Sequence, residues 1–316
     1  MRRVFGVGET VLDVIFKNNQ PLASKAGGSA LNTMVSLARM EVPSYFISEI
    51  GNDKVGNLIM DFLGENRLAT QYVCRFDEGK SALALAFLNE DNDAEYEFFK
   101  DYPTQRLEGE MPDFCKNDII VFGSFFGLNP VVRPRLLDYL NHAKSKGTII
   151  IYDPNFRSHH LENRNNLIKT IEENFLLADI VRGSDEDFYN IYGLKNASDV
   201  YSQVAPFCKN LIVTANKNGV YTFSKDHTHH FKVPIIDPIS TIGAGDNFNA
   251  GMIKAILDFN INKKATLDLS DADLMHLAAY GIEFSSEVCM QMDNYVPGNF
   301  KLHFNSKVKQ RLKLIN

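Results

Sequence analysis

The chain has 316 residues, of which 45% are hydrophobic and 23% charged, and its formal net charge is -6. This composition is typical of a globular protein, and the acidic balance gives no reason to expect a nucleic acid as partner. No apolar run approaches the ~20 residues needed to span a bilayer, so we expect no membrane insertion. The four cysteines form no paired motif and no signal segment opens the chain, so we expect a cytoplasmic protein.

Short apolar runs alternate with helical patterns along the chain. The runs predict buried strands at residues 4–8, 45–50, 118–122, 148–152, 179–181, 211–214 and 231–236. Between them, apolar residues recur at the three-and-four spacing of a helix face, as in Leu31, Met34, Val35 and Ala38. The alternation predicts an α/β fold with a doubly wound, mostly parallel sheet covered by helices on both faces. Ligands of such sheets bind beyond the carboxyl ends of the strands.

One stretch departs from this alternation. Residues 81–88 and 94–99 predict two strands of a hairpin, joined by a polar turn at 89–93. With the apolar segment 11–16 as a third strand, they could form a small sheet that covers a ligand or pairs with another subunit. An extra hairpin on the edge of the main sheet fits the sequence equally well. The histidine-rich tract 227–230 favours a solvated surface turn over a metal site.

Residues 240–246, with the sequence Ser-Thr-Ile-Gly-Ala-Gly-Asp, lie between a predicted strand and a predicted helix. Gly243 and Gly245 allow a tight turn that a ligand can approach, and the first amides of the helix form an anion site. Asp246 would face a bound phosphate and could take the proton of an attacking hydroxyl. Taken alone, this segment favours the simpler interpretation of Asp246 as a helix cap.

Polar residues also follow the first strand and the strand at 148–152. Asp13, Gly28 and Asn32 combine a carboxylate, an approachable backbone and an amide, which are the groups that bind vicinal hydroxyls. Asn155 precedes Arg157, which could bind an oxygen of the substrate or of a phosphate. Each residue alone also fits a turn, a cap or the surface.

Two later strands are followed by acidic and glycine-containing loops. Asp187 could order Mg²⁺ through water. Thr214, Asn216 and Gly219 lie in a loop that could hold nucleotide phosphates.

Together, these motifs resemble the PfkB, or ribokinase-like, family of carbohydrate kinases over nearly the whole chain. Thr241-Ile-Gly-Ala-Gly-Asp246 is similar to the C-terminal motif of the family, and Gly27-Gly28-x-x-x-Asn32 is similar to its N-terminal motif. Within the family, the stretches 8–13 and 153–157 look most like fructokinases.

The resemblance implies a single α/β kinase domain over residues 1–316, with a β-sheet lid inserted from about 11–24 and 81–100 that often contributes to a homodimer. It implies that Asp246 is the catalytic base, and that Gly243, Ala244 and Gly245 form the anion hole. Its implied sugar-binding residues are Asp13, Gly28, Asn32, Asn155 and Arg157. Its implied ATP-binding residues are Thr214, Asn216, Gly219, Thr241, Gly243, Gly245 and Tyr280, and Asp187 would position Mg²⁺.

The chain departs from the family pattern at several positions. Ser240 replaces the usual Asp, which makes a monovalent-cation site doubtful, and Asn216 replaces a glycine that a left-handed Asn can substitute. We therefore expect a kinase that uses ATP and Mg²⁺ to phosphorylate a primary hydroxyl of a small sugar, most like a fructokinase. A 2-keto-3-deoxygluconate kinase, a nucleoside kinase and a catalytically silent sugar or nucleotide sensor on the same fold remain alternatives.

Overall fold

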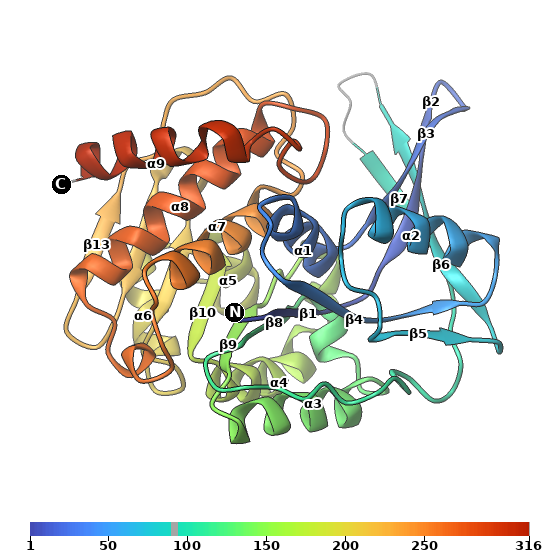
Figure 1. Ribbon diagram of the computed structural model, residues 1–316, viewed down its shortest axis with the longest axis horizontal. Coiled ribbons are helices and arrows are strands. Elements are labelled where there is room, and N and C mark those ends of the chain that lie inside the picture. The colour runs from blue at the N-terminus through green and yellow to red at the C-terminus, as the bar shows by residue number, and fades with distance from the viewer. Residues whose placement is uncertain (90–93, 316) are drawn as a thin grey trace.

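The computed structural model of the protein describes residues 1–89 and 94–315 (Figure 1). Its nine-stranded sheet has the order β13 (Thr228–Phe231), β12 (Val220–Phe223), β11 (Leu211–Thr214), β10 (Ile180–Ser184), β9 (Ile149–Asp153), β8 (Ile119–Gly123), β1 (Val4–Val7), β4 (Ser44–Gly51) and β5 (Val73–Phe76). The strands from β11 to β5 are parallel, whereas β12 and β13 are antiparallel additions at one edge.

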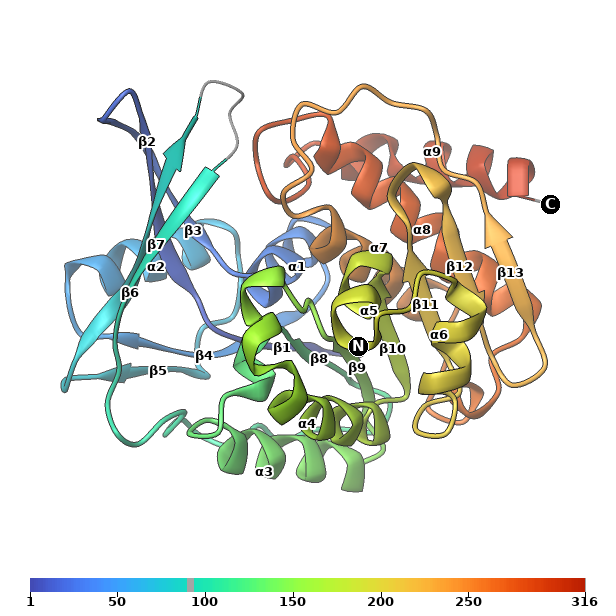
Figure 2. The same ribbon diagram turned by 180° about the vertical axis from the view of Figure 1, so that it is seen from behind.

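Helices cover both faces of this sheet, as Figures 1 and 2 show from opposite sides. One face packs against α1 (Ser29–Arg39), α2 (Lys54–Glu65), α7 (Ala244–Asp258), α8 (Asp271–Cys289) and α9 (Lys301–Ile315). The other packs against α3 (Arg133–Ser145), α4 (Arg164–Leu177), α5 (Asp185–Tyr192) and α6 (Ala197–Val204). Short 3₁₀ turns are η1 (Phe125–Leu128), η2 (Ser158–Asn163), η3 (Asn216–Asn218) and η4 (Ala265–Leu267).

The strand β8 shows why the apolar runs form this sheet. Successive side chains of a strand point to opposite faces, so a strand that is buried on both faces needs an unbroken apolar run. Ile119 and Val121 pack into the core on one side, whereas Ile120 and Phe122 pack into the core on the other. The predicted doubly wound parallel sheet is therefore confirmed.

The predicted strand at 231–236 is wrong. The strand β13 occupies Thr228–Phe231, and residues 232–238 form no strand. Pro234 and Pro238 lack the N–H group that a ladder needs, and the side chain of Ile235 is fully exposed. The histidine tract thus lies largely in β13, and both His227, just before the strand, and His229, within it, contact Asp271. Across the described part of the chain, no group of three or more His, Cys, Asp or Glu residues could hold a metal ion.

A second sheet, which we call the lid sheet, has four strands and projects from one end of the molecule (Figures 1 and 2). Its order is β3 (Gln20–Gly27), β2 (Val11–Lys17), β6 (Lys80–Leu88) and β7 (Ala94–Asp101). The hairpin of β6 and β7 is therefore confirmed and lies outside the main sheet, while most of its predicted turn, residues 90–93, falls outside the described residues.

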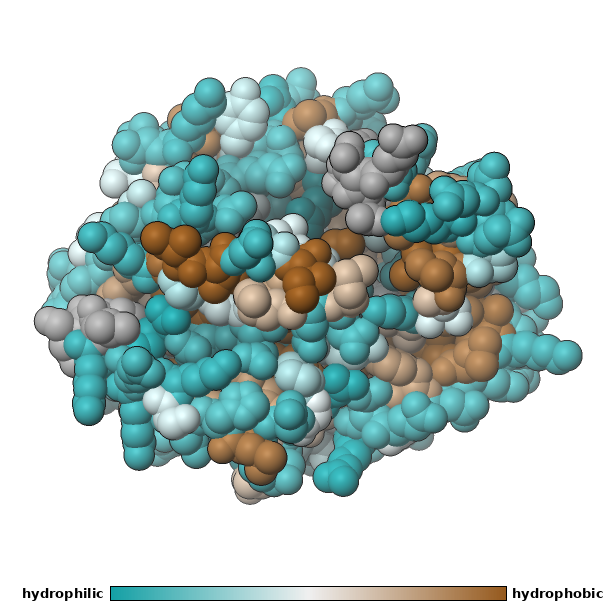
Figure 3. All heavy atoms as spheres, turned by 90° about the horizontal axis from the view of Figure 1, so that it is seen from above, coloured by the Kyte–Doolittle hydropathy of each residue, from teal (hydrophilic) through white to brown (hydrophobic). Residues whose placement is uncertain are grey.

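The lid sheet leaves several large apolar side chains exposed. Figure 3 shows a largely hydrophilic surface with several apolar patches, one of which lies at the lid sheet, on the right. The exposed members are Leu22, Phe87, Tyr96, Phe98 and Phe99. No helix among the described residues combines the length and the apolar character that a membrane crossing requires.

Candidate active site

The turn that precedes α7 is held in place by the loop that follows α8. Gly243 caps α7 with a left-handed φ of 79°, and a Cβ atom there would lie 2.6 Å from the carbonyl oxygen of Asn294. Asn247 Nδ2 donates to the carbonyl oxygens of both Gly243 and Asn294, at 2.8 Å each. The amides of Gly245 and Asp246 belong to the first helical turn, where N–H groups have no intrahelical acceptor. This turn can therefore bind an anion.

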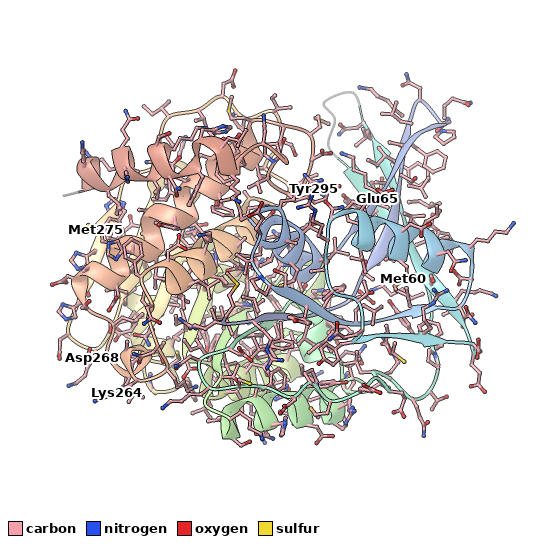
Figure 4. All side chains as sticks on the ribbon, in the orientation of Figure 1. Met60, Glu65, Lys264, Asp268, Met275 and Tyr295 are labelled. Carbon is pink, nitrogen blue, oxygen red and sulfur yellow. The ribbon has the colours of Figure 1, made fainter. Side chains whose placement is uncertain are left out.

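The loop after α8 is in turn fixed against α1. The guanidinium carbon of Arg39 lies 4.5 Å from the ring centroid of Tyr295, which Figure 4 labels. Arg39 also donates to the carbonyl oxygen of Val296. Ser240 closes the turn on its other side, because its Oγ accepts from the amide of Ile242 at 3.2 Å. Ser240 therefore has a local role that needs no cation.

The Asp246 carboxylate is held at the start of α7 by α1. Asn32 Nδ2 donates to Asp246 Oδ2 at 2.8 Å, and Thr33 Oγ1 donates to the carbonyl oxygen of Asp246 at 2.8 Å. Burial raises the pKa of Asp246 to about 7, with a further increase from the charge of Asp153. The hydrogen bond from Asn32 and the charges of Arg157 and Arg182 lower the pKa of Asp246. A carboxylate with this pKa can take up and release a proton near neutrality.

Asp13 lies at the base of the lid sheet, beside the start of α1. Burial raises its pKa to about 6, and a Cβ atom on Gly27 would lie 2.3 Å from Asp13 Oδ2. Gly28, the cap of α1, has φ of +140°, and a Cβ atom there would lie 2.4 Å from the carbonyl oxygen of Glu9. Asn32 Oδ1 is buried and has no hydrogen-bond partner among the described residues. The structure thus places Asp13, Gly28 and Asn32 around one helix start, with acceptors available for hydroxyl groups.

Asp153, Asn155 and Arg157 follow β9, as the sequence predicts. The amide of Asn155 donates to Asp153 Oδ1 at 3.1 Å, and Asn155 Nδ2 donates to Ser124 Oγ at 3.2 Å. The side chain of Arg157 is exposed, and its charge nevertheless acts on the pKa of Asp246. Arg157 therefore lies at the accessible side of the site.

One carboxylate oxygen of Asp187 forms a helix cap, and the other accepts no hydrogen bond from the described residues. Its Oδ2 accepts from the amide and from Oγ of Ser184, at 2.7 Å each, in a capping box at the start of α5. Its Oδ1 is buried, and no residue in the described part of the chain forms a hydrogen bond with it. Burial and the charge of Asp153 raise the pKa of Asp187. The free oxygen fits the predicted contact with water bound to a divalent cation.

The predicted nucleotide loop follows β11 as a tight turn. Asn216 adopts φ of 46°, which is the left-handed conformation that its replacement of glycine requires. Gly219 has φ of +101°, and a Cβ atom there would lie 2.4 Å from the carbonyl oxygen of Phe231. Thr214 ends β11 and accepts a hydrogen bond from Arg182.

Tyr280 lies in the core and not in an open loop. It is 5% exposed, and its ring packs edge-on against Phe259 and Phe304, with centroid distances of 5.6 and 5.0 Å. The structure gives this ring a packing role in α8, and its contact with a nucleotide base stays a prediction.

Sequence reasoning missed two groups of polar residues in this region. Glu9 accepts from Lys100 Nζ at 2.6 Å and from the hydroxyl of Tyr102 at 2.7 Å, which links the loop after β1 to β7. Arg182, in the middle of strand β10, is buried beside Asp153. The signal for Arg182 in the sequence is a basic residue directly after the apolar residues Ile180 and Val181.

Comparisons with known proteins identify the family of the chain. Residues 1–294 match the pfkB family carbohydrate kinase. The chain is 24% identical over 259 residues to a fructokinase of Vibrio alginolyticus, covering 81% of this chain and 84% of the relative.

Solved structures agree in fold. A fructokinase of Vibrio cholerae O395 bound to fructose, ADP and a calcium ion has a TM-score of 0.80 at 19% identity, covering 99% of each chain. An aminoimidazole riboside kinase of Salmonella enterica, complexed with aminoimidazole riboside and an ATP analogue, also has a TM-score of 0.80, at 20% identity, with 97% of this chain and 100% of that chain covered. These similarities show that the fold is ribokinase-like.

Proposed function

Because the chain belongs to the pfkB family of carbohydrate kinases, and is therefore a phosphotransferase with an alcohol acceptor, we propose that it is an ATP-dependent fructokinase. The observation that carries the proposal is the Asp246 carboxylate, which Asn32 holds beside the anion-binding turn of Gly243 to Gly245. A proton acceptor and a phosphate site at one helix start are the parts that phosphoryl transfer to a hydroxyl requires.

In the proposed reaction, a primary hydroxyl of the sugar attacks the γ-phosphate in line. Asp246 takes the hydroxyl proton, and the amides of the first turn of α7 stabilise the charge that develops on the phosphoryl oxygens. A pKa of about 7 suits Asp246 for this role, because the group is substantially ionised at neutral pH yet still accepts a proton.

The charges around the sugar site favour a neutral sugar. Asp13, Gly28 and Asn32 offer acceptors and backbone to hydroxyl groups, and the implied ligands Asn155 and Arg157 follow β9. A sugar acid would need cations for its carboxylate. The ammonium of Lys100 is paired with Glu9, and that of Lys25 is paired with Asp293. Because each lysine already has a carboxylate partner, neither would form an ion pair with a ligand. Arg157 alone would then have to balance the carboxylate of a sugar acid, and we therefore favour fructose over 2-keto-3-deoxygluconate.

ATP would bind along the carboxyl ends of β10 and β11. Its implied contacts include Thr214, Asn216 and Gly219, together with Thr241 of the anion-binding turn. Mg²⁺ bound with ATP would supply neutralisation of the phosphate charge, and the free Oδ1 of Asp187 would face its water.

We assign residues 1–316 to one kinase domain and the lid sheet to covering the sugar. The exposed aromatic side chains of β7 support a homodimer through the lid sheets, because apolar surface of this kind commonly marks an interface. Light scattering on the protein with and without Phe98→Ser and Phe99→Ser substitutions tests the dimer.

A substrate panel tests the proposed function. Formation of ADP is followed with fructose, 2-keto-3-deoxygluconate, ribose, adenosine and aminoimidazole riboside at saturating MgATP. We expect fructose to give the highest kcat/KM, by at least about tenfold, because differential binding of a few hydroxyl contacts supplies that much discrimination.

Each other outcome replaces the proposal with a named alternative. Preference for 2-keto-3-deoxygluconate or for a riboside would assign the protein to that kinase activity. Absence of ADP with every acceptor, together with thermal stabilisation by one sugar, would identify a sensor.

A further inference from the structure

Arg182 is a buried cation to which the proposed mechanism gives no task. It is 5% exposed, its Nη1 donates to Asp153 Oδ2 at 2.9 Å, and its Nη2 donates to Thr214 Oγ1 at 2.5 Å. Asp153 belongs to β9 and Thr214 to β11, the two neighbours of β10 in the sheet. One guanidinium therefore joins the carboxyl ends of three adjacent strands.

The guanidinium also lies directly behind the anion-binding turn. A Cβ atom on Gly245 would lie 2.7 Å from Nη1 and 3.2 Å from Nη2 of Arg182, so only a glycine leaves room for this contact. The guanidinium carbon of Arg182 is 5.4 Å from the ring centroid of Phe248, one turn farther along α7. Arg182 is thus packed between the strand ends and the first turn of α7.

Some of the hydrogen-bonding atoms around Arg182 have partners, and others have none among the described residues. Asp153 Oδ2 accepts from Asn249 Nδ2 at 2.6 Å as well as from Arg182. Arg182 Nε and Asn249 Oδ1 are both buried and have no partner among the described residues. A buried polar atom without a partner is costly, so such atoms are kept where a ligand or a charge change uses them. The charge of Arg182 also lowers the pKa of Asp246.

We propose that Arg182 is a positioning residue for phosphoryl transfer, which holds the Gly245 turn against the strand ends and sets a fixed positive charge behind the transferred phosphoryl group. Asp153 orients the guanidinium and balances its charge before the nucleotide binds. In a site shielded from water, a fixed charge at this position stabilises negative charge without any rearrangement. The inference rests on the proposed function, because it requires a phosphoryl group at this turn.

The test compares Arg182→Gln with Arg182→Lys in the full-length protein. Both replacements can donate hydrogen bonds to Asp153 or Thr214, whereas only lysine keeps the charge. We expect the Gln variant to lose about 100-fold in kcat, as for the loss of one oxyanion-site donor, and the Lys variant to stay within about tenfold of wild type. The midpoint of the acidic limb of the pH–kcat profile should rise in the Gln variant and stay in place in the Lys variant. The KM for the sugar should change less than about threefold in both, because Arg182 contacts no implied sugar ligand.

Arg3→Gln is the matched control, since Arg3 forms an ion pair with Asp118 at the amino ends of β1 and β8, whereas Arg182 lies at the carboxyl ends of the strands. It should leave kcat and the pH midpoint unchanged. Equal kcat and equal midpoints in the Gln and Lys variants of Arg182 would overturn the inference. If the Gln variant does not fold, Gly245→Ala moves the guanidinium while keeping every charge, and a kcat within threefold of wild type would then overturn it. A wild-type protein that phosphorylates no acceptor would instead refute the proposed function.

Discussion

The main sheet carries an Arg–Asp pair near each end of its strands, and the two pairs are built differently. At the amino end, the Asp118 carboxylate accepts from the amide, Nε and Nη2 of Arg3 and from the amide of Cys115. At the carboxyl end, Arg182 is shared between Asp153 and Thr214 and keeps an unpartnered Nε. The first carboxylate is saturated by protein donors, whereas the second pair belongs to a cluster with unused polar atoms.

This difference separates stability from function. A saturated pair can only hold elements together, because no donor or acceptor is left for a ligand. A cluster with unused donors and acceptors, such as Arg182 Nε, Asp187 Oδ1 and Asn249 Oδ1, stores unfavourable free energy that a ligand can recover. Substitutions at the two ends should therefore affect different measurements.

The largest effect is expected at Asp246. Asp246→Asn keeps an acceptor for Asn32 Nδ2 but cannot take a proton, so kcat should fall by roughly two to four orders of magnitude. Binding of sugar and nucleotide, measured by calorimetry, should persist, and the melting temperature should not fall. Near-normal turnover in this variant would remove Asp246 from the mechanism.

The next effect concerns the saturated pair at the amino end. Asp118→Ala leaves Arg3 and two backbone amides without their acceptor, so the free energy of unfolding should fall by about 3 kcal/mol. Urea unfolding measures this loss, and kcat assayed well below the melting temperature should be unchanged. A large fall in kcat with little loss of stability would contradict the separation between the two ends.

The dependence of stability on pH should reveal Asp246 without any substrate. Its pKa is about 7 in the folded protein and 3.8 as a reference, so the folded state binds the proton more tightly. The contribution of this group to stability is therefore present below about pH 4 and is lost as pH rises towards 7. Asp13, with a pKa of about 6, acts in the same direction.

Thermal melts of the ligand-free protein between pH 4 and 8 measure this slope. Wild type should lose stability relative to Asp246→Asn as pH rises through this window, because the amide does not titrate. Parallel curves for the two proteins would mean that the pKa of Asp246 is not raised. Activity should change in the opposite sense and increase with pH up to about 7, since the ionised carboxylate is the base.

The sequence predicted the framework of the site better than its interior. The strand β8 can be predicted from its apolar run, because a strand that is buried on both faces needs apolar side chains throughout. The turn at Gly243 can be predicted because its left-handed φ favours glycine. The cluster around Arg182 depends on which strands are neighbours. Val181 pairs with Tyr152, which places Arg182 next to Asp153 although 29 positions separate them. Hydrophobic periodicity contains no information on that pairing.

Local patterns also failed where the chain context overrode them. Residues 232–238 are apolar enough for a strand, but two prolines remove the donors that an edge ladder needs. At Tyr280, the predicted contact with a nucleotide base stays a prediction, and the structure adds that the ring lies in the core between two phenylalanines. Packing of this kind depends on α8 and α9 together, which no single motif describes.

The smallest effect is expected from Asn32, and it asks whether the unused atoms at the carboxyl end serve the ligand. The hydrogen bond that Asn32 donates to Asp246 Oδ2 lowers the pKa of Asp246 in the wild type. Asn32→Ala removes this donor, and it also removes the buried Oδ1, which has no partner among the described residues. The acidic limb of the pH–kcat profile should therefore move to higher pH by less than about one unit, and the KM for fructose should rise about tenfold, the equivalent of one hydrogen bond. Asn262→Ala is the control, since Asn262 Oδ1 accepts from the amides of Lys264 and Ala265, and the adjacent Lys263 is paired with Asp179 just before β10, at the amino end of the strands. A rise in KM without a shift in the midpoint would assign Asn32 to the sugar alone, and a shift to lower pH would contradict its hydrogen bond to the ionised base.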